Sequence, residues 1–156
     1  MKILQYKKNS LCALFVIFIL SLCGSVAQNF KGVKNLTFPQ DYKNGVLYTS
    51  ITRGGVIEDI YAQEADILAL QKEGKLPELA TITMEEYANN NGTHGNLNRY
   101  IIMQKHGKQW RFEAFNADKS INVKENTTRC LNCHASAIEG EDIVFTLDSL
   151  KKFPLR

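Results

Sequence analysis

Residues 130–134 have the sequence Cys-Leu-Asn-Cys-His, and no other part of the chain combines residue types so suited to specific chemistry. Two thiols separated by two residues can form thioethers with the two vinyl groups of one porphyrin. The histidine that follows is then held next to the iron, which needs a nitrogen ligand on its proximal side. The motif therefore predicts one covalently attached haem c, bound through Cys130 and Cys133, with His134 as axial ligand of the iron.

The same two cysteines would also suit a redox-active pair or half of a zinc site. A closed zinc site needs four ligands, and only His94 and His106 would remain to complete it, at spacings unlike those of zinc fingers. A thioredoxin-type pair would belong to a βαβ unit, which the residues upstream do not predict. Haem attachment is therefore the favoured interpretation.

The ligand opposite His134 decides whether such a protein carries electrons or binds a small molecule. Only 22 residues follow His134, and none of them is Met or His. A sixth ligand would have to come from Met84, Met103, His94 or His106. The methionines are expected to fill apolar strands and the histidines to lie in a loop and a turn. We therefore expect an open or water-occupied distal site, with an electron-transfer cytochrome using a methionine ligand as the alternative.

The N-terminal residues have the order typical of a secretory signal. Three lysines without any acid precede the apolar run 11–23, and the small residues 24–27 follow it. The run has 13 residues, whereas a membrane-spanning helix needs roughly 20. We expect cleavage after Ala27 and a periplasmic bacterial protein that is free of the membrane after cleavage. Lipid attachment at Cys23 is the lesser alternative, because bulky Leu22 precedes it.

Charge gives no reason to expect a nucleic-acid or membrane partner. Residues 1–27 hold three of the nineteen basic residues and none of the sixteen acids, so the mature chain would carry sixteen of each. The remaining 129 residues suffice for one domain that buries roughly two thirds of its unfolded surface. We assign residues 28–45 to a polar N-terminal lead and residues 46–156 to a single haem domain.

Hydrophobic patterns predict an α+β fold with a mainly antiparallel sheet of about five strands and one or two helices. A helix is expected from Ala62 to Leu70, with Gly74 just past its end. The Asn- and Gly-rich residues 89–98 are expected to form a loop, and residues 117–128 to be irregular. Short extended segments are expected at residues 46–52, 56–61, 81–84, 99–105, 109–115 and 143–146.

From about Val46 to Thr146 the chain resembles the cytochrome P-460 and cytochrome c′-beta family. The matching features are Ile60-Tyr61-Ala62 before a helix, residues 74–78 before a strand, the aromatic-rich residues 110–115, and the late Cys-x-x-Cys-His motif followed by residues 142–146. The resemblance implies a homodimer with one haem packed against an antiparallel sheet, and five-coordinate iron with His134 as proximal ligand. It also implies one of two activities: hydroxylamine oxidation by a haem cross-linked to lysine, or binding of nitric oxide or carbon monoxide.

The chain departs from the resemblance at the cross-linking lysine. That position falls at or near Met84, and no lysine occurs between Lys75 and Arg99. The departure favours an iron that binds a small diatomic or nitrogen-oxide ligand, and it makes hydroxylamine oxidation the second alternative after electron transfer. A redox partner protein is a further expectation.

Several residues are expected to surround the haem. The expected pocket residues are Ile82, Met84, Phe112 and Phe115. Glu85 and Glu113 are the candidates for a catalytic acid that would relay protons near the iron.

Overall fold

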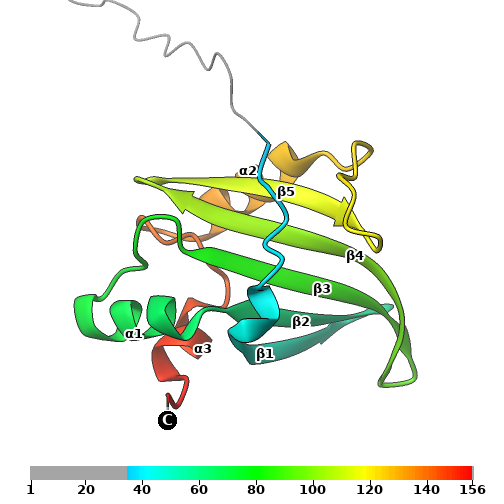
Figure 1. The fold of residues 1–156 in the computed structure, drawn as a ribbon, viewed down its shortest axis with the longest axis horizontal. Coiled ribbons are helices and arrows are strands. Elements are labelled where there is room, and N and C mark those ends of the chain that lie inside the picture. Colours follow the sequence, from blue (N-terminus) through cyan, green and yellow to red (C-terminus); the bar gives the residue numbers. More distant parts are fainter. Residues whose placement is uncertain (1–34, 156) are drawn as a thin grey trace, which may run out of the picture. The chain divides into compact units, whose positions relative to one another are not determined.

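The structure is a computed structural model that describes residues 35–155. These residues are built on one five-stranded antiparallel sheet (Figure 1). The predicted signal peptide 1–27 lies outside the described residues. Each strand pairs with the next one along the chain, so the sheet is a meander in the order β1-β2-β3-β4-β5. The expected mainly antiparallel α+β fold is confirmed. The strands are β1 (Val46–Arg53), β2 (Val56–Ala62), β3 (Thr81–Asn90), β4 (Thr93–His106) and β5 (Gln109–Asn116).

Within residues 35–155, three α-helices accompany the sheet, where one or two were expected. They are α1 (Glu64–Glu73), α2 (Thr127–Ala137) and α3 (Leu147–Lys152), and a short 3-10 helix, η1 (Tyr42–Asn44), precedes β1. Helix α1 ends as predicted at Gly74, whose left-handed backbone (φ 77°) lets its N–H donate to the Leu70 carbonyl. Among residues 35–155, no helix combines the length and apolarity that crossing a bilayer requires.

The loop expected at residues 89–98 is wrong, because these residues extend β3 and β4 into a long hairpin. Asn90 pairs with Thr93 and Asn89 pairs with His94 across a two-residue turn. The turn residues Asn91 and Gly92 have φ angles of 54° and 89°. Asn-Gly supplies the two positive φ angles that a tight hairpin turn requires. The polar residues thus mark a turn between paired strands rather than an irregular segment.

The strand expected at residues 143–146 is also wrong. Ile143 and Val144 are buried but pair with no strand; a turn follows in which the Leu147 N–H donates to the Val144 carbonyl, and α3 begins at Leu147. Their apolar character reflects burial against the core and not pairing in the sheet. A short apolar run does not by itself distinguish these two situations.

The two faces of the sheet carry separate apolar clusters. One cluster packs between the sheet and the helices, and includes Ile67 and Leu70 of α1 and Leu150 of α3. We call this side of the sheet the helix-covered face. Because side chains alternate along a strand, Ile82 faces the helices while neighbouring Thr83 faces the other way.

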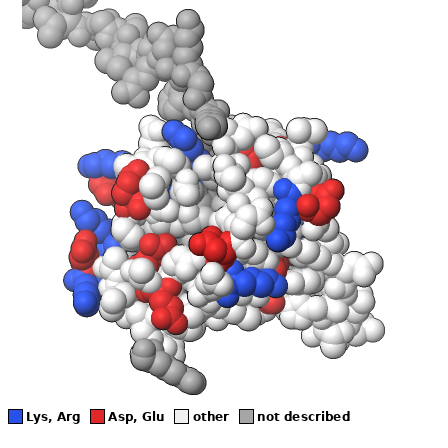
Figure 2. All heavy atoms as spheres, in the orientation of Figure 1, with Lys and Arg blue, Asp and Glu red and all other residues white. Residues whose placement is uncertain are grey.

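The opposite side, which we call the lead-covered face, packs against the segment that precedes β1. In Figure 1 this segment crosses the sheet on the side away from α2. Leu36, Phe38 and Tyr42 of the segment are buried against Tyr100 and Phe115 of the sheet. The described part of the expected polar lead, residues 35–45, therefore contributes apolar side chains to the fold. Figure 2 shows acidic and basic side chains interspersed on this side of the described residues, with neither sign gathered into a large patch.

Gly45 joins η1 to β1 where the backbone passes closest to the end of β2, and it generates a stability prediction. A Cβ atom at this position would lie 2.3 Å from the Ala62 carbonyl oxygen. We expect Gly45→Ala to lower the free energy of unfolding by about 1–3 kcal/mol, because backbone must move to relieve the overlap. Urea unfolding at neutral pH measures the change.

Gly55→Ala is the matched control, because a Cβ atom there meets nothing within 4 Å. Its effect should stay within about 0.5 kcal/mol. Equal losses in the two variants would contradict the close approach at Gly45.

Candidate functional site

A cavity of about 340 Å³ lies between the helix-covered face and α2. The sheet supplies an apolar floor to it. The floor side chains are Ile51, Ile60, Ile82, Met84, Ile101, Met103 and Phe112. The segment after α2 closes another side with Val144, Phe145 and Thr146. A cavity of this size with a largely apolar lining falls within the range of small-molecule and cofactor sites.

All three chemically specific residues of the motif line this cavity. Cys130, Cys133 and His134 lie three and four residues apart on α2, so they share one side of the helix. Cys130 is half-buried and Cys133 exposed, and both are free thiols. Helix α2 has no buried residue. The helix thus contacts the rest of the protein mainly along the cavity that its cysteines line.

The environment of Cys130 does not suit a redox-active cysteine pair. Burial raises the pKa of its thiol, and the Glu125 carboxylate raises it further. A reactive cysteine of the thioredoxin type requires the opposite shift, because the thiolate is the nucleophile.

The two histidines that would have to complete a zinc site lie away from the cysteines. His94 lies in the β3–β4 hairpin, 3.1 Å from Asp59, and His106 lies at the β4–β5 turn, 2.9 Å from the Gln104 side chain. Neither lines the cavity. Within residues 35–155, no three His, Cys, Asp or Glu side chains gather as a metal ion would require.

His134 is held in a form suited to bind iron. Its Nδ1 atom lies 2.7 Å from the carbonyl oxygen of Ile143. A carbonyl only accepts hydrogen bonds, so Nδ1 carries the proton and the Nε2 lone pair is free. Burial lowers the pKa of the imidazole, which keeps it neutral at pH 7. Phe112 and Phe145 contact the ring edge-on, with centroids 4.9 and 4.5 Å away.

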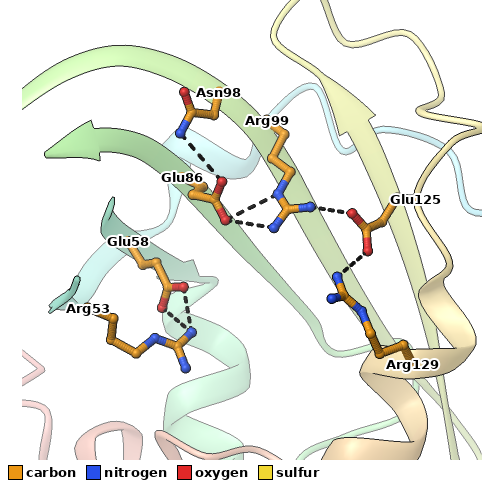
Figure 3. Close-up of polar contacts among 7 residues, drawn as sticks. All are labelled: Arg53, Glu58, Glu86, Asn98, Arg99, Glu125 and Arg129. Carbon is orange, nitrogen blue, oxygen red and sulfur yellow. Dashed lines mark hydrogen bonds and ion pairs between the residues drawn. The ribbon is translucent and has the colours of Figure 1, made fainter. Parts of the chain in front are cut away.

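One end of the cavity is lined by a chain of four charged side chains, shown in Figure 3. Arg99 donates from Nε and Nη2 to one oxygen of Glu86, at 3.1 and 2.9 Å. Its third nitrogen donates to Glu125, whose other oxygen accepts from Arg129 at 2.5 Å. Glu86 and Arg99 belong to the sheet, whereas Arg129 belongs to α2. The chain therefore ties the start of α2 to the sheet.

A separate ion pair lines the same end (Figure 3). Arg53 donates to both oxygens of buried Glu58, at 2.5 and 2.6 Å. Together with Arg99 and Arg129, this pair makes one end of the cavity polar while the floor remains apolar. The site is thus amphipathic, as the porphyrin of haem is.

The structure brings three of the four expected pocket residues to the cavity. Ile82, Met84 and Phe112 line it, and Phe112 also contacts His134. Phe115 does not, and this expectation is corrected. It packs on the lead-covered face, with its ring centroid 5.2 Å from that of Phe38. Phe112 and Phe115 are three residues apart on one strand, so their side chains point to opposite faces.

The two candidate acids are corrected for the same reason. Glu85 is only 1 % exposed, but it lies on the lead-covered face, where Tyr42, Tyr87 and Lys43 donate to it. Glu113 shares the face of Phe115, two residues further along β5. Neither lines the cavity.

The acids that do line the cavity are Glu58, Glu86 and Glu125, which sequence reasoning missed. A usable signal existed for two of them. Glu58 lies two residues from Ile60, and Glu86 lies two residues from Met84, so strand alternation puts each on the cavity side. Of the four expected distal-ligand candidates, the cavity includes Met84 and Met103.

A Cys-x-x-Cys-His helix that faces an apolar cavity on a single antiparallel sheet defines the class as a sheet-based haem protein. Residues 39–146 match the family model described as Cytochrome P460, so the chain belongs to the cytochrome P460 family. Membership implies haem and iron. The resemblance found in the sequence is thereby confirmed. Comparison with curated proteins gave no match.

The position of Glu85 on the face away from the cavity gives a pH prediction. Burial raises the pKa of Glu85, but hydrogen bonds from Tyr42, Lys43 and Tyr87 outweigh it, so the pKa lies below its usual 4.5. A carboxylate with a lowered folded-state pKa stabilises the fold above pH 4.5, and the contribution is lost as pH falls through the folded-state value. We expect Glu85→Gln to cost about 1–3 kcal/mol at pH 7 and progressively less below pH 4.5.

Urea unfolding of both proteins between pH 7 and pH 3 measures this difference. The control is Glu113→Gln on the same face, expected to change stability by less than about 0.5 kcal/mol. A Glu85→Gln deficit that stays constant with pH would be incompatible with the charged form being the stabilising one.

Proposed function

We propose that this chain is an exported mono-haem c-type protein whose iron binds a small diatomic or nitrogen-oxide ligand. The observation that carries the proposal is the convergence of Cys130, Cys133 and His134 on one cavity, with the Nε2 lone pair of His134 free. The cavity suits an amphipathic macrocycle packed against the sheet, because its floor is apolar and one end carries three guanidinium groups.

The residues that would hold the cofactor are assigned by their chemistry. Cys130 and Cys133 would form the two thioethers, and His134 would ligate the iron. Arg53 and Arg129 line one end of the cavity, where each uses only its Nη2 atom for a glutamate, so their remaining N–H groups could donate to carboxylates such as propionates. Bound haem would supply an iron whose second axial position accepts a small ligand.

The floor of the cavity supports ligand binding over hydroxylamine oxidation. Lysine does not occur among the described residues that line the cavity, so no side chain there could form the lysine cross-link. Met84 stands near the position that the resemblance assigns to that lysine, and it is packed against the apolar cluster.

The second candidate function is electron transfer, and a specific observation favours it: both Met84 and Met103 line the cavity. A methionine sulfur bound to iron would give a six-coordinate centre of the kind found in electron-carrying cytochromes. A redox partner protein would then be required.

Covalent attachment and export are tested together. Protein recovered from the periplasm of a host that matures c-type cytochromes should have the mass of residues 28–156 plus one haem. Haem should stay with the wild-type chain in denaturant and be released from the Cys130→Ala, Cys133→Ala double variant. The measurement is mass spectrometry with haem staining after denaturing electrophoresis. A colourless mature chain with both thiols titratable would overturn the proposal.

The distal site is tested by optical spectroscopy of the reduced protein. We expect a five-coordinate spectrum that changes on addition of nitric oxide or carbon monoxide. Met84→Leu and Met103→Leu should each leave the ligand-free spectrum unchanged, because neither sulfur binds the iron. A low-spin spectrum that is insensitive to both gases, and that is lost in one of these variants, would support the electron-transfer alternative instead.

A further inference from the structure

A buried ion pair between Lys105 and Asp142 lies next to the group that orients His134. The imidazole donates its Nδ1–H to the carbonyl of Ile143, which directly follows Asp142 in the chain. Resting on the proposed haem ligation by His134, we propose that Lys105 and Asp142 are positioning residues for this axial ligand: their ion pair fixes the Ile143 carbonyl, and through it the imidazole.

The ion pair is buried, and each of its charged groups also bonds to the backbone of Leu76. Lys105 Nζ lies 2.6 Å from Asp142 Oδ1, and the two side chains are 4 % and 7 % exposed. The second carboxylate oxygen of Asp142 accepts from the Leu76 N–H at 2.8 Å, and Lys105 Nζ donates to the Leu76 carbonyl at 2.8 Å. Both charged groups thus clamp a single peptide residue, Leu76, in the connection between α1 and β3.

This arrangement holds Asp142 in three directions. Lys105 belongs to β4, which pairs with a strand on either side, so the carboxylate is attached to the interior of the sheet. On the preceding residue, the Glu141 carbonyl accepts from the indole N–H of Trp110 on β5, at 2.8 Å. The Val144 N–H donates back to the Asp142 carbonyl, also at 2.8 Å.

Ile143 is enclosed between these fixed points. Its side chain is 8 % exposed and that of Val144 is 3 % exposed, so the segment is also packed against the core. The carbonyl that accepts from His134 is one residue from the ion pair. A displacement of Asp142 therefore reaches the imidazole through a single residue and one hydrogen bond.

Such a device would act on the metal ligand and not merely on stability. Buried ion pairs often contribute little net stability compared with apolar replacements, because desolvation offsets the attraction. By contrast, a group that accepts a hydrogen bond from the second ring nitrogen of a metal-bound histidine, the one not bound to the metal, orients the ring and raises its basicity. A well-fixed Ile143 carbonyl would give a strong hydrogen bond and an electron-rich imidazole.

The test is resonance Raman spectroscopy of the reduced holoprotein, because the iron–histidine stretching band reports the strength of the Nδ1–H hydrogen bond. Asp142→Asn keeps the size of the side chain but removes one charged acceptor. We expect the band to broaden and move to lower frequency, because a looser Ile143 carbonyl accepts a weaker hydrogen bond. Lys105→Gln, which leaves Asp142 bonded to the Leu76 N–H, should shift the band in the same direction by less.

Glu141→Gln is the matched control. Glu141 directly precedes Asp142, and its carboxylate forms an exposed ion pair with Lys108 at 3.0 Å, which the substitution removes. The Glu141 backbone carbonyl still accepts from Trp110. Its band should coincide with that of the wild type. A general disturbance of this segment would shift the control as well and would overturn the inference.

The outcomes separate this inference from the proposed function. Wild-type protein without an iron–histidine band would refute the five-coordinate iron with His134 as axial ligand on which the proposed function rests. If the wild-type protein shows the band, and the band is unchanged in each of the variants Asp142→Asn and Lys105→Gln that retains haem, the positioning role alone is refuted. A shift in either variant, with the control unchanged, supports it.

Discussion

Successive side chains on a strand point to opposite faces of a sheet, and the sheet of residues 46–116 uses its two faces for different purposes. The helix-covered face forms the floor of the cavity, and the lead-covered face packs against the segment before β1. A shift of one residue in any strand would therefore exchange cavity side chains for packing side chains. Tight turns fix the register of three of the four strand pairs, and the assignment of the cavity-floor residues depends on that register.

The cavity combines an apolar floor with charged groups that are already paired. Isolated charges lining an apolar cavity would be costly, but each carboxylate at the polar end accepts hydrogen bonds from a guanidinium group. The chain from Glu86 to Arg129 also joins the sheet to the helix that carries the cysteines. Electrostatics and placement of the motif are thus parts of one arrangement. The neutral, singly protonated form of His134 completes it, since that tautomer offers its lone pair to the cavity.

Sequence alone predicted the parts of this structure whose causes are local. The motif at Cys130–His134 and the end of α1 at Gly74 depend on chemistry within a few residues. The Asn91-Gly92 turn was local too, but its composition was taken for a loop. Helix α2 escaped prediction because it has no buried residue, so no apolar stripe marks it. Phe115 and Glu85 were misplaced because aromatic or acidic type was weighed without strand alternation, and the Lys105–Asp142 pair joins residues 37 apart.

The order of strands has a consequence for how the chain reaches its native state. Two-residue turns join β1 to β2, β3 to β4 and β4 to β5, and residues 63–80 with α1 join β2 to β3. The sheet can therefore assemble from contacts that are close in sequence, at small entropic cost. The contacts that hold the segment after α2 against the rest of the fold close much longer loops of chain. Leu76 and Asp142 are 66 residues apart in sequence, and Tyr48 and Thr146 are 98 residues apart. Since that cost grows with loop length, the sheet has reason to form first and the thiol-bearing helix to dock late. A macrocycle joined to that helix beforehand would then be carried into place by the final folding step.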